Sequence, residues 1–173
     1  MCVGKMRFEI REFSGSYEVR RLTEADVPEM LTLCKGNPQY YRYCPPTASE
    51  ETLLADLQAL PPQKTSDDKY YVGYYKEGQL IALLDLIDAF PNDETAFIGF
   101  FMVRSEISGT GVGSRIVGEL CEYLAGCGIR AVHLGWVEGN PQAEAFWKKN
   151  GFAETGVKSQ QELYTIVMGE RKI

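Results

Sequence analysis

One short segment, Ser108–Ser114, constrains the fold more than any other part of the chain. It reads Ser-Gly-Thr-Gly-Val-Gly-Ser and lies between an apolar strand pattern and an amphipathic helix pattern. Alternate glycines expose backbone N–H groups, and the N-terminus of the following helix adds a partial positive charge. Such a turn can bind an anion such as a diphosphate without help from Lys or Arg side chains. The alternative is a glycine-rich turn that serves only to reverse the chain tightly.

Two familiar phosphate-binding motifs do not fit this segment. A Walker A loop ends in Gly-Lys-Ser/Thr, whereas Gly113-Ser114-Arg115 contains no lysine. The dinucleotide-binding pattern requires a further glycine three residues after its second one, and Ser114 or Ile116 stands there instead. The segment therefore favours a different phosphate-bearing ligand.

Composition limits the domain count and the classes of partner. A length of 173 residues suits one domain, residues 1–173, with a sizeable core. The net charge of −6 argues against nucleic acid as the main partner. No apolar run approaches the ~20 residues of a membrane helix, and residues 1–10 lack a signal-peptide core. We therefore expect a cytoplasmic protein with no membrane partner.

The cysteines and the single histidine argue against a metal site. The five cysteines, Cys2 among them, form no Cys-x-x-Cys pair, and the one histidine is His133. An odd number of thiols fits a reducing compartment, where free cysteines behave as small apolar residues. We expect no metal, and a structural role for His133.

Periodicity along the chain predicts one mixed α/β domain. Capping residues and apolar residues at helical spacing predict helices over 23–34, 47–60, 112–124 and 140–149. Alternating or apolar runs predict strands over 17–22, 70–76, 80–87, 96–103, 131–137, 152–158 and 163–168. Strand 96–103 is apolar on both faces and should be central. The helix that follows it should make strand 131–137 its parallel neighbour.

Two blocks of residues, separated by one helix and one strand, resemble the GNAT superfamily of N-acetyltransferases. The first is the glycine turn, which matches the family's acetyl-CoA turn except that Ser108 replaces its usual Gln or Arg. The second comprises Asn140, Ala143, Trp147 and the pair Gly151-Phe152. The close match covers about residues 96–152, so the resemblance says little about the two helices that precede it.

The resemblance implies a GNAT-like α/β fold of the α+β type. Its central sheet should be mixed, mostly antiparallel, of six to seven strands flanked by helices, and splayed between the two parallel strands that end at Val103 and Val137. Acetyl-CoA would be the co-substrate, with its pyrophosphate on the turn and its pantetheine arm in the splay. Backbone N–H groups near Met102 and Val103 would form the oxyanion hole. The cofactor-binding residues are then Met102, Val103, Ser108, Gly109, Thr110, Gly111, Val112, Gly113, Ser114, Asn140, Ala143 and Trp147.

The implied reaction moves an acetyl group from acetyl-CoA to a primary amine by direct attack. The acceptor would be a small molecule or a peptide, and the sequence does not identify it. Two alternatives stay open: a CoA-binding sensor or interaction module without turnover, and another acyl donor such as succinyl-CoA. A homodimer is compatible with the sequence.

Candidate catalytic residues follow from the need to remove a proton from the amine. Asp85 lies in an apolar strand, where a carboxylate is costly unless paired, and Glu94 is a second candidate base. Trp147 replaces the family's Tyr acid, and its indole N–H is not a workable acid, so Tyr123 and Tyr164 become candidates by residue type. The tyrosines of segment 40–43 would shape the acceptor pocket or simply pack.

Overall fold

The computed structural model describes residues 6–173, so Cys2 lies outside the described residues. Seven strands form one sheet in the order β1-β2-β3-β4-β5-β7-β6. All neighbours are antiparallel except β4 and β5, which are parallel. The strands are β1 (Glu18–Arg21), β2 (Lys69–Lys76), β3 (Gln79–Ile87), β4 (Thr95–Val103), β5 (Ala131–Val137), β6 (Ala153–Gln160) and β7 (Thr165–Lys172).

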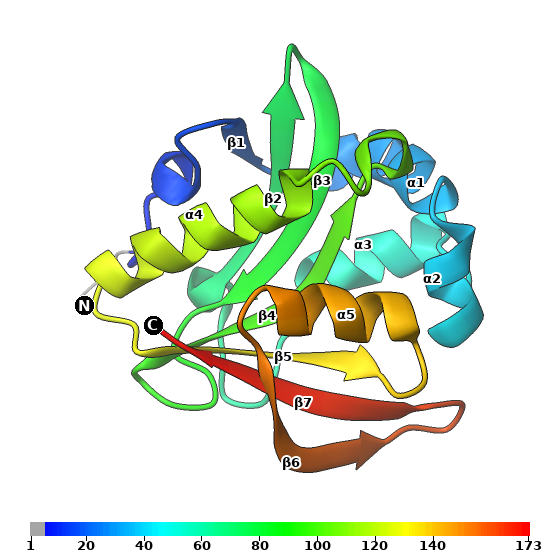
Figure 1. Ribbon diagram of the computed structural model, residues 1–173. Helices are drawn as coiled ribbons and strands as arrows, with labels where there is room; N and C mark the ends of the chain where they lie inside the picture. The colour runs from blue at the N-terminus through cyan, green and yellow to red at the C-terminus, as the bar shows by residue number, and fades with distance from the viewer. Residues whose placement is uncertain (1–5) are drawn as a thin grey trace.

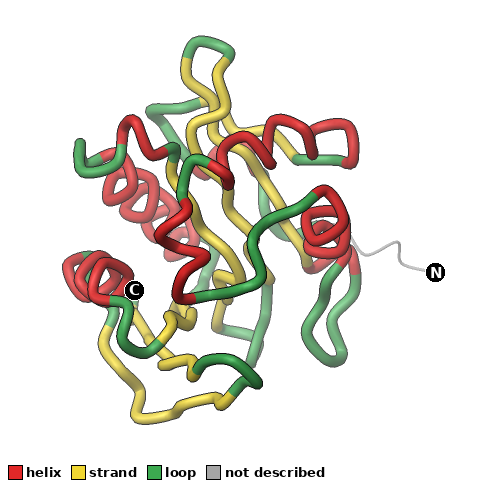
Figure 2. Tube along the Cα trace, turned by 90° about the vertical axis from the view of Figure 1, so that its right-hand side faces the viewer, coloured by secondary structure: helices red, strands yellow, loops and turns green. Residues whose placement is uncertain are grey.

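Helices cover both faces of the sheet (Figure 1). One core cluster packs α4 and α5 against one face, and a second packs α1 and α3 against the other. Seen from the side, the strands lie between the two groups of helices (Figure 2). The helices are α1 (Val27–Lys35), α2 (Pro38–Tyr43), α3 (Glu50–Gln58), α4 (Val112–Gly126) and α5 (Pro141–Lys149). None of the helices in residues 6–173 is long and apolar enough to cross a membrane.

The sheet separates at the parallel pair in its centre. Pairing between β4 and β5 covers only four positions, from Thr95 opposite Ala131 to Ile98 opposite Leu134. Beyond Ile98 the two strands run apart, as Figure 1 shows. The central position of β4 and the splay after it agree with the sequence-based expectation.

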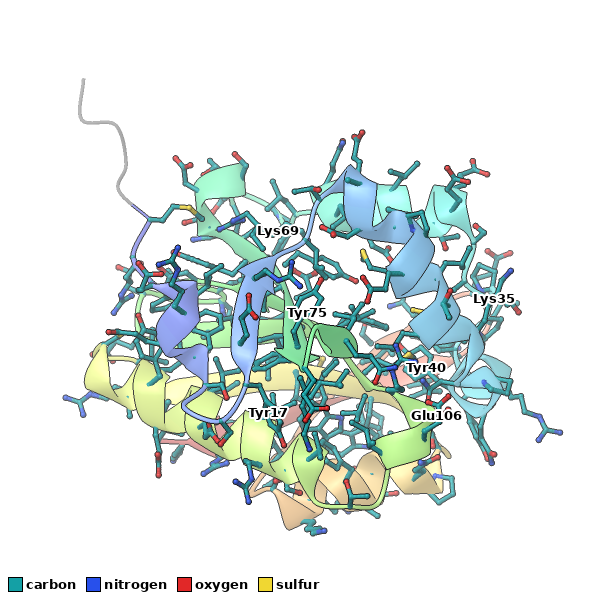
Figure 3. The ribbon with its side chains drawn as sticks, turned by 90° about the horizontal axis from the view of Figure 1, so that it is seen from above. Tyr17, Lys35, Tyr40, Lys69, Tyr75 and Glu106 are labelled. Atoms are coloured by element: carbon teal, nitrogen blue, oxygen red, sulfur yellow. The ribbon has the colours of Figure 1, made fainter. Side chains whose placement is uncertain are left out.

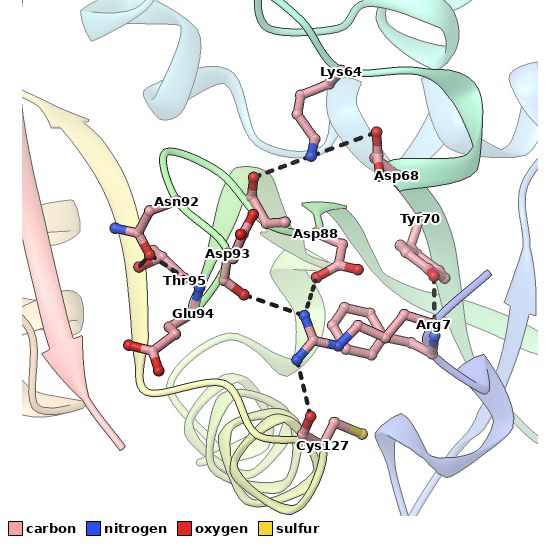
Figure 4. A network of polar contacts seen from close by, with 12 residues as sticks. Arg7, Lys64, Asp68, Tyr70, Asp88, Asn92, Asp93, Glu94, Thr95 and Cys127 are labelled. Atoms are coloured by element: carbon pink, nitrogen blue, oxygen red, sulfur yellow. Dashed lines mark hydrogen bonds and ion pairs between the residues drawn. The ribbon is translucent and has the colours of Figure 1, made fainter. Parts of the chain in front are cut away.

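A polar network fixes the opposite end of the sheet (Figure 4). The Arg7 guanidinium donates to Asp88 Oδ1 at 3.2 Å and to Asp93 O at 3.3 Å, in the connection from β3 to β4. It also donates to Cys127 O at the end of α4, at 3.0 Å. These bonds join the N-terminal segment, the sheet and α4 at the end of the sheet away from the splay.

The predicted elements occur with small shifts and one addition. Strand β5 has the predicted bounds, and β7 runs to Lys172, four residues beyond the prediction. Helix α3 begins at Glu50 because Ser49 is its N-cap, accepting from Thr52 N at 3.1 Å. Helix α2 is the addition, formed by the aromatic segment that the sequence leaves without a helix assignment.

Candidate active site

A groove with a volume of about 340 Å³ lies at the splayed end of the parallel strands. Its walls are the end of β4, the glycine turn, α5, and the segment that joins α1 to α2. Every predicted cofactor-binding residue lines it except Thr110 and Val112. The sequence motifs therefore converge on one concave site.

The glycine turn carries the chain from β4 into α4 with open backbone N–H groups. Gly111 precedes α4 with a φ of +90°, a conformation that strains residues with a side chain. Within the described chain no side chain caps this helix, so the N–H groups of its first turn, Val112 to Ser114, point outward without an intrahelical acceptor. A Cβ on Gly113 would lie 3.1 Å from Phe146 Cε2, so this glycine lets α4 and α5 approach closely.

At the end of β4, the N–H groups of alternate residues point toward the groove. Arg104 N–H donates to Ile81 O of β3 at 2.8 Å, which sets the hydrogen-bonded register of the pair. Alternation then turns the Met102 amide toward β3 and the amides of Phe101 and Val103 toward the splayed edge. Of the two positions expected to supply an oxyanion hole, Met102 and Val103, only Val103 faces the groove with its N–H.

Helix α5 forms the aromatic wall of the groove. Asn140 caps it, since its Oδ1 accepts from Ala143 N at 3.2 Å. Phe146 stacks on Phe101 with ring centroids 6.0 Å apart, and Trp147 lies edge-on to Phe146 at 4.8 Å. Trp147 is 8% exposed. Its ring fills the junction of α5 with the sheet and borders the groove.

Charge in the groove suits an anion. Lys149 is the only charged residue among the described residues that line it. With the open amides of the turn and the positive end of α4, this lining fits the diphosphate of acetyl-CoA. Sequence motifs miss Lys149, Phe101 and Phe146, because nothing in the local pattern separates groove-lining residues from core or surface ones.

Asp85 lies in a second cavity, which borders the groove at Tyr40. We call it the tyrosine cavity, because Tyr40, Tyr41, Tyr71 and Tyr164 line it. Asp85 Oδ2 pairs with Lys69 Nζ at 3.0 Å, and the Asp85 side chain is 13% exposed. Burial, only partly offset by Lys69, raises the pKa of Asp85 to about 6. Figure 3 labels Tyr40 on α2 and Lys69 on β2.

The other candidate residues lie in different surroundings. Glu94 is exposed at the start of β4, beside the Arg7 network and at the far end of the strand from the groove. His133 Nε2 lies 2.7 Å from Glu170 Oε2 across β5 and β7. Tyr123 Oη accepts from Glu9 N at 2.8 Å, outside both cavities.

Tyr164 is the one candidate acid near the site, because it lines the tyrosine cavity. The neighbouring Cys44 thiol, together with burial, raises the pKa of Tyr164 to about 12. Its proton is therefore held more tightly than in an ordinary tyrosine.

Comparisons with known proteins identify the family. The model of the Acetyltransferase (GNAT) family matches residues 32–152. Among solved structures, an acetyltransferase from Thermus thermophilus is 20% identical with a TM-score of 0.74, over 91% of this chain and 97% of that one. The PaiA N-acetyltransferase from Thermoplasma acidophilum, solved with coenzyme A, is 18% identical with a TM-score of 0.66, over 91% and 99%.

A third structure, the ribosomal-protein-S18-alanine N-acetyltransferase from Escherichia coli, is 14% identical with a TM-score of 0.65, over 91% and 94% of the two chains. At these identities the structural matches show the fold. No match was found among curated proteins. The family model spans well over half of the chain and includes both motif blocks. The protein belongs to the GNAT family and is an acetyl-CoA-dependent N-acetyltransferase.

Proposed function

We propose that the protein transfers the acetyl group of acetyl-CoA to a primary amine by direct nucleophilic attack, and that the amine enters through the tyrosine cavity. One observation supports the proposal most directly: the groove and the tyrosine cavity, which differ in charge, share Tyr40 as a lining residue. One has open amides and a single cationic side chain, whereas the other contains a buried carboxylate. These are the two environments that the donor and the acceptor of this reaction need.

Different residues of the groove would bind different parts of acetyl-CoA. The first-turn amides of α4 would hold the pyrophosphate, and the splayed edge of β4 would pair with the amides of the pantetheine arm. Acetyl-CoA supplies the acetyl group as a thioester. The Val103 N–H, which faces the groove, would stabilise the charge that develops on the carbonyl oxygen.

Asp85 is the proposed acceptor of the proton that the amine releases. Its Oδ1 has no hydrogen-bond partner within the described chain, whereas its Oδ2 is held by Lys69. As the new N–C bond forms, the C–S bond breaks and the proton passes to Asp85 directly or through a water. The departing thiolate needs little acid help, because a free thiol has a pKa of ~8.5. Glu94 lies at the wrong end of β4 for this role.

Thiol release from acetyl-CoA in the presence of an amine panel tests the proposal. We expect amine-dependent release, and a slower rate when succinyl-CoA replaces acetyl-CoA. A protein that binds CoA but releases no thiol with any amine would instead be a binding module. A faster rate with succinyl-CoA would overturn the choice of donor.

A matched pair of variants tests the binding site for the pyrophosphate. Ser114→Asp places a negative charge on the first turn of α4, where it suits the helix but repels a phosphate. Arg115→Gln changes the net charge by the same amount at an exposed position outside the groove. We expect Ser114→Asp to weaken CoA binding by about tenfold or more, and Arg115→Gln to leave it unchanged. Equal affinities for the two variants would contradict the assignment.

A further inference from the structure

The tyrosine cavity lies on the face of the sheet that α1 and α3 cover. Its volume of about 390 Å³ is at the lower end of the ~300–1,000 Å³ typical of small-molecule sites. Successive residues of β4, Phe100 and Phe101, line the cavity and the groove respectively, and Tyr40 borders both. A molecule in the cavity therefore lies beside the end of the groove.

Two buried polar atoms in this cavity lack partners. In residues 6–173, the buried side-chain atoms without a hydrogen bond are Tyr71 Oη, Tyr74 Oη and Asp85 Oδ1. Tyr71 and Asp85 lie opposite each other in the β2–β3 register, and both line the cavity. Tyr74 instead belongs to the core cluster on the α4 side. Because buried oxygens without donors are costly, a ligand carrying N–H groups would satisfy the first pair.

The charged residues around the cavity favour a ligand with a single positive charge. Asp56 and Asp85 are the only charged residues among the described residues that line it. Lys69 Nζ binds Asp85 Oδ2 at 3.0 Å and Ala59 O at 2.7 Å. The charge of Lys69 also lowers the pKa of Asp56, an exposed residue at the cavity wall, against the rise that its partial burial causes, so one lysine serves two carboxylates. A single positive charge restores the balance, whereas a polycation would exceed it.

Aromatic rings make up much of the remaining wall. The Tyr40 and Tyr41 ring centroids are 4.9 Å apart, and those of Tyr40 and Phe100 are 5.8 Å apart, both edge-to-face. Such rings accept an apolar body, and their faces attract a cation. A strongly polar or anionic ligand would find few partners here.

We propose that the acceptor is a small primary amine with one positive charge and a compact apolar body, whose ammonium group binds between Asp85 Oδ1 and Tyr71 Oη. The body of the amine packs against the rings of Tyr40, Tyr41 and Phe100. This inference rests on the proposed function, since it names the class of acceptor for the same reaction. It also assigns Tyr71, which no sequence motif marks, to recognition of the acceptor.

Calorimetric titration of the CoA-saturated protein with 2-phenylethylamine tests the binding geometry. We expect saturable binding of this amine and none of 3-phenylpropanoate, which has a similar shape but carries a carboxylate. Tyr71→Phe and Asp85→Asn should each weaken binding by about tenfold. Tyr74→Phe is the matched control, because it removes an equally buried, unpartnered hydroxyl from the other core cluster.

The acceptor class and the proposed function are tested by different outcomes. If Tyr71→Phe and Tyr74→Phe bind 2-phenylethylamine with equal affinity, the assignment of Tyr71 is wrong. If 3-phenylpropanoate binds as well as the amine, the acceptor class is wrong. The same conclusion follows if spermidine, a polycation, is acetylated faster than 2-phenylethylamine, although the proposed function then stands. If thiol release fails with every amine while 2-phenylethylamine still binds in a Tyr71-dependent way, the cavity assignment holds and the proposed function fails. Should Asp85→Asn not fold, Asp56→Asn replaces it and should weaken binding of the cation in the same direction.

Discussion

Asp85 could be recognised in the sequence as a candidate site residue, but the residues around it could not. A carboxylate within an apolar strand is conspicuous, because burial is costly unless a partner compensates it. The partner, Lys69, is not conspicuous, since the pairing depends on the register of β2 against β3. In that register Tyr71 lies directly opposite Asp85, and Lys69 lies two residues earlier on the same face. The sequence thus identifies the charge but not the groups that position it.

The pKa of Asp85 predicts the acidic limb of the pH profile. Burial raises this pKa to about 6, with Lys69 lowering it and Asp56 raising it further. Asp85 accepts a proton only when ionised, so kcat/KM for the amine should rise as the pH increases through about 6. Rates between about pH 5 and pH 8 would measure this limb. Asp85→Asn should lower the rate and abolish that limb, and a variant that keeps the full wild-type profile would exclude Asp85 as the base.

Trp147 should serve packing rather than proton transfer. Its ring contacts Phe101 at 5.7 Å and Phe152 at 5.2 Å between centroids. Trp147→Phe should therefore keep most of kcat, whereas Trp147→Ala should cost ~3–5 kcal/mol of stability through the cavity it leaves. Urea unfolding and steady-state kinetics separate the two effects. A hundredfold loss of kcat in a stably folded Trp147→Phe protein would contradict this role.

At the scale of elements, local patterns predict local structure. The glycine turn and the Asn140 cap are encoded within a few residues, so both could be predicted together with most strand bounds. Helix α2 could not, because its six residues are too few to show helical periodicity. A bulge in β4 is also invisible in the sequence. Asp85 pairs with Phe100 and Leu86 with Ile98, which leaves Gly99 as the extra residue.

The bulge predicts a distinct effect of a single methyl group. A Cβ on Gly99 would lie 2.9 Å from Asp85 Oδ2, the oxygen that Lys69 holds. Gly99→Ala should displace this carboxylate and lower kcat/KM for the amine by about tenfold, without changing the Kd of acetyl-CoA. Gly118→Ala in α4 is the control, since a Cβ there meets nothing within 4 Å. Equal kinetics for the two variants would show that Asp85 tolerates the shift.

At the scale of the whole molecule, the sheet consists of two parts that meet along a short seam. Strands β1 to β4 form one part and β5 to β7 the other, joined in the sheet by the pairing of Thr95–Ile98 with Ala131–Leu134. The Arg7 network reinforces the closed end. The open end keeps the β4 edge accessible, and α4 and α5 reach it from one face while α2 borders it near Tyr40. The end that the Arg7 hydrogen bonds join and the end that carries the groove therefore lie at opposite ends of the parallel pair.

Amide hydrogen exchange should show a ligand bridging this open end. The Phe101 and Val103 amides face the splayed edge, whereas alternation turns the Met102 amide toward β3. In the free protein we expect the first two amides to exchange faster than that of Met102. Saturating CoA should slow exchange at Phe101 and Val103 if the pantetheine arm pairs with β4, and the already bonded Met102 amide is the internal reference. Ser114→Asp should weaken this protection at a fixed CoA concentration, because it removes the phosphate anchor without touching β4. Equal slowing at all three positions would indicate a general stabilisation of the fold rather than pairing along this edge.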